Sequence, residues 1–504
     1  MLGFYGKNAH AIHLSMYSRI RSAGVPRATV LMLVVLLHCY GCTDVDYPTD
    51  ILDKSPYDMS GGCFIIDGNA PFAYSQQVTL SSYVDNAYWM QFSYDAMSWV
   101  DWVAFDNHSM WLLPLQYGNT TVYAQYKNIR GDIVAYQDSI FFVERLVEGS
   151  SIQLGGDVAV SNDGAIVAAG TLYGRANAVY VFHKQSIDWQ GTKIKPDDIV
   201  DGDRFGYCVA LSGDGRWLFA GAPGKNAVYV YEYTDAWQLR QVIECSFSLF
   251  GYDTATDDTG EYVAVTVYDG QRVEVYRRNG SKVYGLASVI DVAGYKPYSV
   301  TLTGDAGFLF IGWGAISDAG MVKVYQRAGS SFSCIGDILP GDGQHYAFFG
   351  QSVAVTDDAG WCVIGSPGYD ILPNDDKGCF YVYKKNTDNT FSLLTQIKNT
   401  GGNRGDALGG AVAMSVDGNT IFASMHLYDS GIDAVDRGLV QVYRFDGSGV
   451  EHIDTYFPDD RITTCYFGNA IAASNNGVIV IGAPYAYTNT AGDNGGIVYI
   501  RRWL

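Results

Sequence analysis

The amino-acid sequence predicts an all-β protein in which a small β-sandwich precedes a seven-bladed β-propeller. Three observations lead to this prediction. Glycine (58 residues) and tyrosine (38 residues) are abundant and charged residues make up only 17%, which suits short strands joined by tight turns. The C-terminal two-thirds of the chain repeats one strand-turn-strand pattern. The stretch before the repeats contains short segments of alternating polar and apolar residues.

The first segment, residues 1–41, is predicted to be an export signal. A basic stretch ends at Arg27, and an apolar stretch over 28–37 follows that is too short to span a bilayer comfortably. Gly41 then precedes Cys42. This order resembles a bacterial lipoprotein signal, in which Cys42 would carry lipid after cleavage.

The signal departs from the usual lipoprotein pattern at Cys39, where such signals commonly have leucine. A cleaved signal without lipid and an uncleaved anchor are the alternatives, and Met16 competes with Met1 as the start. Residues 42–61 are acidic and rich in turn formers, which predicts a tether.

Residues 62–144 are expected to form a small β-sandwich. The stretch also resembles a bacterial Ig-like domain, a spacer or adhesion module of surface proteins. The resemblance is carried by the pair Trp99 and Trp102 and by four strand-like segments, namely 78–80, 90–93, 121–126 and 138–140. We expect both tryptophans to pack in the core rather than form a carbohydrate platform, because tryptophan is highly buried on average.

Residues 145–504 contain the repeats. The clearest repeat begins with Phe205-Gly206, continues through a Gly-Asp-Gly turn at 213–215, and ends with the alternating strand 226–231. Starts of the same pattern occur at residues 154, 205, 250, 296, 349, 408 and 467. This spacing is typical of one four-stranded propeller blade.

Each part of the repeat has a physical role in such a blade. The first strand is built from small residues, as crowding near a propeller axis requires. The Asp-Gly turn supplies a positive φ for a tight hairpin, and the third strand alternates two wide faces. The last repeat ends at its third strand, so we expect residues 142–147 to complete the ring.

The Phe-Gly pairs at 205, 250, 349 and 467 and the Gly-Ala-Pro triplets at 221 and 482 resemble the FG-GAP repeat of integrin α heads. The resemblance implies a seven-bladed propeller. Many such repeats carry a calcium loop of the DxDxDG kind. Here the turns, such as Ser212–Gly215, offer one or two carboxylates at most, so we expect neither calcium sites nor another cofactor.

Charge and isolated reactive residues exclude several functions. The net charge of −20 repels phosphate backbones, which argues against nucleic-acid binding. The nine cysteines are scattered singly, which predicts buried apolar residues rather than zinc ligands or disulfides. The eight histidines form no catalytic motif, so a non-catalytic protein is expected.

Three long polar loops are the candidate binding site. They link the second and third strands of the last three repeats, over 368–378, 428–438 and 485–495, and we expect them to emerge side by side on one face. The candidate binding residues in these loops are Tyr369, Asp370, Asp375, Asp376, Tyr428, Asp429, Asp433, Asp436, Tyr485, Tyr487 and Asp493.

These features predict a monomeric, lipid-anchored protein of the bacterial cell envelope, facing the periplasm or the cell surface, whose propeller binds a protein or glycan. One alternative is a polysaccharide hydrolase or lyase with Asp433 and Asp376 as acid and base. Another is a scaffold for envelope assembly. The Arg-Gly-Asp tripeptides at 130–132 and 404–406 are interpreted as turns rather than adhesion motifs.

Overall fold

The computed structural model describes residues 59, 62–70, 72–114, 118–142, 144–148, 152–186, 188–292, 294–313, 320–341, 347–373, 375–429, 436–458, 464–487 and 494–503. The predicted signal, Cys42 and the predicted tether up to residue 58 lie outside this range. Met59, at the end of the predicted tether, is buried. No helix in the described part of the chain is long and apolar enough to cross a membrane. The chain divides into two compact units, and the larger one contains everything from Phe141 onward.

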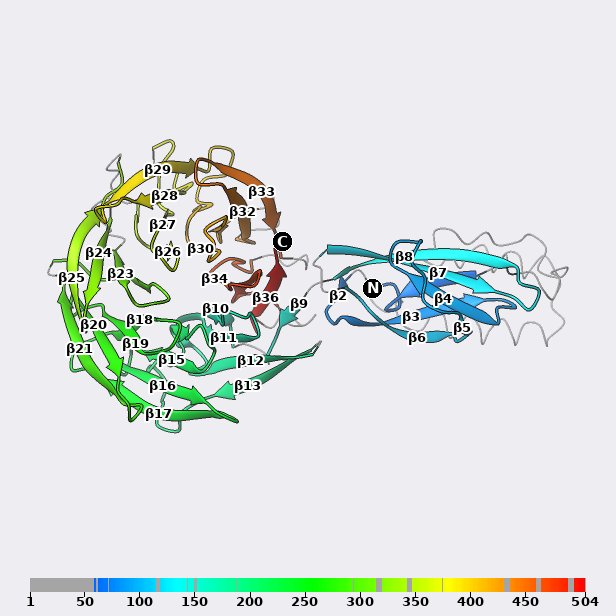
Figure 1. The fold of residues 1–504 in the computed structure, drawn as a ribbon, viewed down its shortest axis with the longest axis horizontal. Coiled ribbons are helices and arrows are strands. Elements are labelled where there is room, and N and C mark those ends of the chain that lie inside the picture. The colour runs from blue at the N-terminus through cyan, green and yellow to red at the C-terminus, as the bar shows by residue number, and fades with distance from the viewer. Residues whose placement is uncertain are drawn as a thin grey trace, which may run out of the picture. The chain divides into compact units, whose positions relative to one another are not determined.

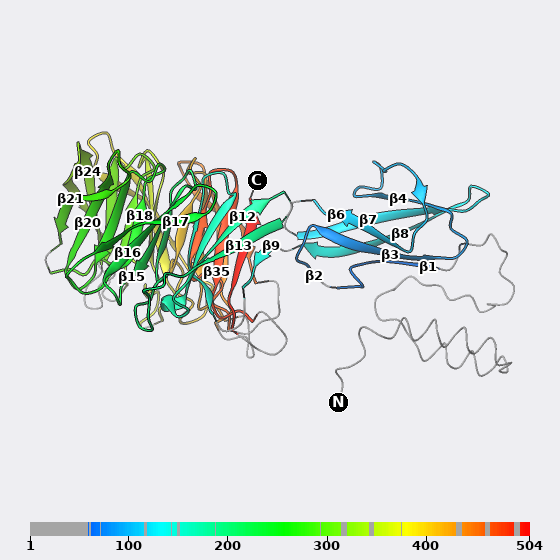
Figure 2. The ribbon, with the colours of Figure 1, turned by 90° about the horizontal axis from the view of Figure 1, so that it is seen from below.

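The strands that precede β9 (Glu144–Leu146) form two sheets, and most of their residues belong to the smaller unit (Figure 2). One sheet is made, in spatial order, of β1 (Gly62–Ile66), β3 (Gln77–Val84) and β6 (His108–Leu112). The other is made of β2 (Phe72–Ala73), β8 (Ile133–Phe142), β7 (Gly118–Lys127), β4 (Trp89–Ser93) and β5 (Val103–Ala104). The ring of Phe92 lies 6.1 Å from that of Phe64 and 5.3 Å from that of Trp111, so aromatic side chains join the two sheets into a sandwich.

The expectation that Trp99 and Trp102 fill the sandwich core is wrong. Both side chains are only half-buried and lie in the segment between β4 and β5. The Nζ atom of Lys127 stands 4.2 Å from the ring centre of Trp102, and neighbouring Met97 is 83% exposed. The core is instead filled by side chains of the strands, including Phe64, Phe92 and Tyr126, and the tryptophan-rich segment stays partly open to solvent.

The larger unit contains, within its described residues, seven four-stranded antiparallel sheets. Sheet one consists of β10 (Leu154–Val160), β11 (Ile166–Thr171), β12 (Val179–Gln185) and β13 (Asp188–Ile194), with the 3₁₀ turn η1 (Leu172–Gly174) after β11. Sheet two consists of β14 (Val209–Leu211), β15 (Trp217–Ala222), β16 (Ala227–Tyr233) and β17 (Trp237–Glu244). Sheet three consists of β18 (Phe250–Thr256), β19 (Tyr262–Val267), β20 (Arg272–Arg278) and β21 (Tyr284–Asp291).

The remaining sheets keep the same order. Sheet four consists of β22 (Ser299–Leu302), β23 (Phe308–Trp313), β24 (Met321–Ala328) and β25 (Ser331–Ile338). Sheet five consists of β26 (Val353–Val355), β27 (Trp361–Ser366), β28 (Cys379–Lys385) and β29 (Phe391–Lys398). Sheet six consists of β30 (Val412–Met414), β31 (Thr420–Met425), β32 (Leu439–Phe445) and β33 (Val450–Tyr456). Sheet seven consists of β34 (Ile471–Ala473), β35 (Val478–Ala483), β36 (Ile497–Arg502) and β9 (Glu144–Leu146).

The sheets follow one another around a ring, with each first strand near the centre and each fourth strand at the rim (Figure 1). Sheet seven takes its outermost strand from the other end of the unit, because β9 pairs with β36 through Leu146↔Val498 and Glu144↔Ile500. The prediction that residues 142–147 complete the ring is therefore confirmed.

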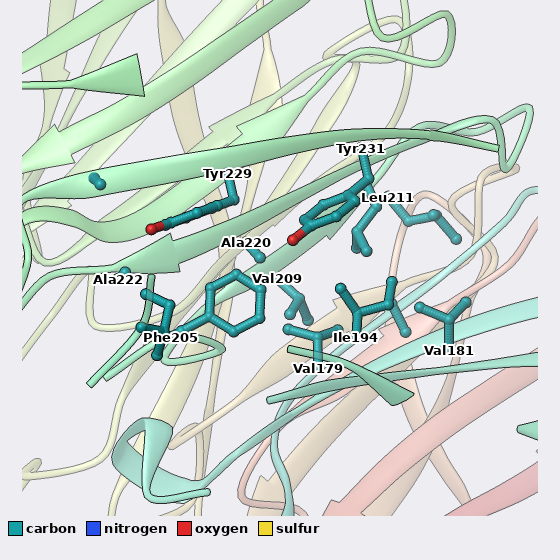
Figure 3. Close-up of a cluster of buried hydrophobic side chains, with 14 residues drawn as sticks. Val179, Val181, Ile194, Phe205, Val209, Leu211, Ala220, Ala222, Tyr229 and Tyr231 are labelled. Atoms are coloured by element: carbon teal, nitrogen blue, oxygen red, sulfur yellow. The ribbon is translucent and has the colours of Figure 1, made fainter. Parts of the chain in front are cut away.

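Apolar side chains fill the space between neighbouring sheets. Between sheets one and two, Val179 and Val181 of β12 face Val209 of β14 and Tyr229 of β16, all of them buried (Figure 3). The alternation of the third strand explains this packing, since one of its faces contacts the preceding sheet and the other the next. Most described cysteines share such positions, whereas Cys334 is exposed.

Side chains at the centre of the ring link the first strands to one another. Asp157 accepts a hydrogen bond from the Val209 backbone N–H (2.7 Å), and Asp253 accepts one from that of Val300 (2.8 Å). Burial raises the pKa of Asp157 to about 6, and burial together with the nearby Asp157 raises the pKa of Asp253 to about 8. Ionising both carboxyl groups inside this crowded centre therefore costs free energy.

Removing the apolar anchor of β9 should open the ring. Leu146 is buried against sheets one and seven, whereas the adjacent Val147 is 42% exposed. We expect Leu146→Ala to lower the free energy of unfolding by about 2–5 kcal/mol, through lost burial and a cavity, and Val147→Ala to change it by less than about 0.5 kcal/mol. Denaturant unfolding measures both. Equal effects would contradict the role assigned to β9.

The stability of the protein should depend on whether the carboxyl group of Asp253 is protonated. Because its pKa is raised in the folded state, its contribution is fully present below the unfolded pKa and is lost as pH rises toward 8. As pH rises from 5 to 9, the free energy of unfolding of the unmodified protein should fall. We expect it to fall by at least about 1.4 kcal/mol less in Asp253→Asn, a difference that corresponds to one pKa unit. Asp188→Asn, on the exposed strand β13, controls for loss of one negative charge. Parallel pH profiles for all three proteins would contradict the assignment.

Candidate functional site

The three long loops lie on one face of the ring. In an antiparallel four-stranded sheet, the link between strands two and three leaves from the same end as the link to the next sheet. The end of each loop is tied there to the start of the following sheet by one parallel bridge. These bridges are Gly378↔Leu408, Gly438↔Phe467 and Leu154↔Gly496.

The loop of sheet five is held by its own carboxylates. Asp370 accepts hydrogen bonds from the backbone N–H groups of Asp375 (2.8 Å) and Asp376 (2.9 Å). Asp375, which is buried, accepts from those of Ile371 and Leu372. Tyr369 is buried as well, and its hydroxyl group accepts a hydrogen bond from Lys398 at 2.6 Å. These candidate residues therefore shape the loop rather than face a ligand.

The loop of sheet six repeats this design. Asp429 accepts a hydrogen bond from the Asp436 backbone N–H (2.8 Å), as Asp370 does from Asp376. Tyr428 packs against the core between sheets five and six. The hydroxyl group of Tyr466 donates to the Asp436 carboxylate at 3.4 Å. Asp433 lies outside the described residues.

In the loop of sheet seven, no carboxylate among the described residues caps the backbone in this way. The Gly496 N–H donates to the Ala486 carbonyl, the counterpart of the bond from Gly438 to Tyr428 in sheet six. This correspondence places Tyr487 at the position of Asp429. The ring of Tyr485 stands edge-on to that of Tyr466, 4.9 Å away. Asp493 lies outside the described residues.

Asp376 and Asp436 occupy equivalent positions on neighbouring loops. Both adopt a left-handed conformation, with φ values of 42° and 51°. Burial, with a smaller contribution from Asp370, raises the pKa of Asp376, and burial with Asp429 raises the pKa of Asp436. Among the described carboxyl groups of the three loops, these two have a raised pKa, as buried functional carboxyl groups often do.

Both Arg-Gly-Asp tripeptides form turns. Asp406 is only 1% exposed and accepts a hydrogen bond from the Asn403 backbone N–H at 2.6 Å. Asp132 accepts one from the side chain of Asn128 at 2.8 Å, beside Gly131 with a φ of 92°. Burial keeps Asp406 from a partner, whereas Arg130, Gly131 and Asp132 are exposed in the hairpin between β7 and β8.

A group of tyrosines near the ring axis on this face was missed by the sequence reasoning. We call Tyr173, Tyr207, Tyr252, Tyr268 and Tyr298 the axial tyrosine cluster. Tyr252 is its centre, with ring distances of 5.0 Å to Tyr207, 4.6 Å to Tyr268 and 5.6 Å to Tyr298. Tyr173, 63% exposed, stands 6.3 Å from Tyr207. The signal that could have revealed it is the Phe-Gly-Tyr sequence at 205–207 and 250–252.

Burial perturbs the hydroxyl groups of the axial tyrosine cluster and that of Tyr466, a tyrosine beside the loops. Burial raises the pKa values of Tyr207, Tyr252 and Tyr298, so their hydroxyl groups stay protonated at neutral pH. The pKa of Tyr466, next to the loop of sheet six, is also raised, mainly by burial, with a contribution from Tyr173. The face thus carries partly buried aromatic rings with protonated hydroxyl groups, together with the loops of sheets five and six, which are held by internal hydrogen bonds.

His426, which follows β31, has its ring 6.4 Å from that of Tyr466. Its Nδ1 atom is buried and has no hydrogen-bond partner among the described residues. Burial lowers its pKa to about 4, so the imidazole is neutral at pH 7. A Cβ atom on Gly410 would stand 2.4 Å from this ring, so glycine makes room for the histidine.

The hairpin turns on the opposite face use their carboxylates internally. Asp214 accepts hydrogen bonds from the Ser212 hydroxyl group (2.5 Å) and from the Arg216 backbone N–H (2.9 Å). Ser161 and Asp163, and Ser415 and Asp417, repeat the arrangement. Among the described residues, no group of three or more histidine, cysteine or acidic side chains is placed to hold a metal ion.

Comparison with known proteins agrees with this architecture. The FG-GAP repeat model matches residues 189–231 and 333–383. Both segments run from the fourth strand of one sheet to the third strand of the next. Among curated proteins, no sequence matches the chain significantly.

Several solved structures resemble this chain. A chain of Kuenenia stuttgartiensis hydrazine synthase has a TM-score of 0.50 at 11% identity, over 71% of this chain and 97% of its own. A chain of the mitotic checkpoint complex has a TM-score of 0.50 at 12% identity, over 71% and 93%. The β-propeller domain of Cps50 (Swd1) from Myceliophteria thermophila has a TM-score of 0.49 at 10% identity, over 72% and 100%. At these identities the likeness concerns the fold alone.

The ring of sheets therefore defines an all-β protein of the β-propeller class. More particularly, two segments of this ring match the FG-GAP repeat.

Proposed function

We propose that this chain is an exported, lipid-anchored protein of the bacterial cell envelope that recognises a protein or glycan partner without catalysis. In this proposal Cys42 carries the lipid, an Ig-like sandwich serves as spacer, and the seven sheets are the blades of one seven-bladed ring. The binding surface is the face that carries the axial tyrosine cluster and the long loops.

The observation that carries this proposal is the axial tyrosine cluster, on the same face of the ring as the long loops. Tyrosine offers a large amphipathic contact area with few rotatable bonds, and it is enriched where proteins bind partners. Tyr173 is exposed beside the half-buried Tyr207 and Tyr252, so aromatic surface and hydroxyl groups are both accessible.

The hydrogen bonds inside the loops support binding in a second way. Because Asp370 and Asp429 already hold their loops in one conformation, less conformational entropy is lost when a partner binds. The same bonds occupy these carboxylates, which makes them poor acids or bases.

Loss of the central tyrosines should abolish capture of the partner. We expect the Tyr207→Ala, Tyr252→Ala double variant to retain less than about a tenth of the material that the unmodified protein captures from an envelope extract, because hot-spot aromatics carry much of a binding energy. Quantitative pull-down measures it, and thermal unfolding checks that the variant is folded. Tyr88→Ala, at an exposed site of the sandwich, is the control.

A folded double variant with unchanged capture would contradict the proposal. Treating the extract with protease or with glycosidases beforehand separates a protein partner from a glycan.

One observation favours a second candidate, a polysaccharide hydrolase or lyase. The raised pKa of Asp376 is what a general acid needs. If the purified protein degrades polysaccharide, Asp376→Asn should lower the rate at least about 100-fold, while Asp388→Asn, in the hairpin between β28 and β29, should not. Reducing-end release from a polysaccharide panel measures this. Absent turnover, or turnover unaffected by Asp376→Asn, excludes this role.

A further inference from the structure

A second surface lies on the face opposite to the long loops. It is a groove between the hairpins that join the third and fourth strands of sheets one and two. Its aromatic wall is formed by His183, Tyr233 and Trp237. Its polar side chains include Gln185, Gln190 and Asp235.

The aromatic wall is organised before any ligand binds. The His183 ring lies 4.5 Å from the Tyr233 ring, which lies 5.2 Å from the Trp237 ring. The indole N–H of Trp237 donates a hydrogen bond to Nε2 of His183 at 3.1 Å. Burial lowers the pKa of His183, so the ring is neutral at pH 7 and accepts this bond. All three side chains remain partly exposed.

The polar side chains surround this wall with both donors and acceptors. The amides of Gln185 and Gln190 contact each other, and each keeps further hydrogen-bonding capacity. Asp235 is exposed and adds a carboxylate. None of the side chains that line this described groove is lysine or arginine, so the site offers nothing to neutralise a phosphate or a carboxylate ligand.

Packing between the sheets explains only part of this arrangement. Trp237 contacts the buried cluster between sheets one and two, as an interior tryptophan would. Tyr233 and His183 are not part of that cluster, and they stack on each other at the surface. A wall of aromatic rings bordered by amide and carboxylate groups, without positive charge, fits a neutral ligand that has an apolar face and many hydroxyl groups.

We propose that this groove binds a neutral saccharide. One sugar ring stacks against the wall formed by Tyr233 and Trp237, and its hydroxyl groups bond to Gln185, Gln190 and Asp235. The site is separate from the axial tyrosine cluster, so this proposal is independent of the function proposed above.

Titration of the purified protein with neutral oligosaccharides tests this proposal. The probes are oligomers of glucose, mannose, galactose and N-acetylglucosamine, followed by calorimetry and by tryptophan fluorescence. We expect at least one series to bind, and Trp237→Ala to weaken its binding at least about tenfold. Gln190→Ala, an exposed change that should leave folding intact, should weaken binding as well.

Three controls decide the outcome. Leu239→Ala changes an exposed residue of the same strand β17 outside the groove and should bind like the unmodified protein. The Tyr207→Ala, Tyr252→Ala variant should also bind the saccharide normally, which separates this site from the opposite face. The proposal is overturned if no neutral series binds, if uronic-acid oligomers bind as tightly as neutral ones, or if folded Trp237→Ala and Gln190→Ala bind unchanged.

Discussion

The ring depends on close backbone contact between neighbouring sheets near the axis. A Cβ atom on Gly221 would stand 2.3 Å from the carbonyl oxygen of Gly251 in the next sheet, and one on Gly482 would stand 2.1 Å from that of Gly155. Such distances leave no space for a side chain. Gly251 also has a φ of 82°, a conformation that other residues rarely adopt. The glycines of the Phe-Gly and Gly-Ala-Pro sequences are therefore two sides of one contact.

The phenylalanine of the repeat completes this contact from the side. Phe205 is fully buried and stands edge-on to Tyr229 of the third strand, 5.1 Å away, and Phe467 meets Tyr499 in the same way. Each of these two phenylalanines thereby joins the third strand of its own sheet to the preceding sheet. Loops that leave this rigid frame can vary in length without disturbing it, which is why binding surfaces develop there.

The candidate site could be predicted in position but only partly in its residues. Loop length and polarity placed the three loops on one face. Sequence reasoning could not show that Asp370 and Asp429 bond to their own backbone, because such bonds depend on the folded path of the loop. It placed Trp99 and Trp102 in the core on average behaviour alone, whereas strand residues such as Phe64 and Phe92 already fill that core.

Local and repeated features of this protein were determined by the sequence itself: the β-rich composition, the periodic glycines and the missing last strand. They are readable because a repeat imposes the same backbone demand many times. Tertiary structure alone decided the axial tyrosine cluster and the aromatic groove. Tyr207 and Tyr252, or His183 and Trp237, lie far apart in the chain and meet only when neighbouring sheets close around the axis.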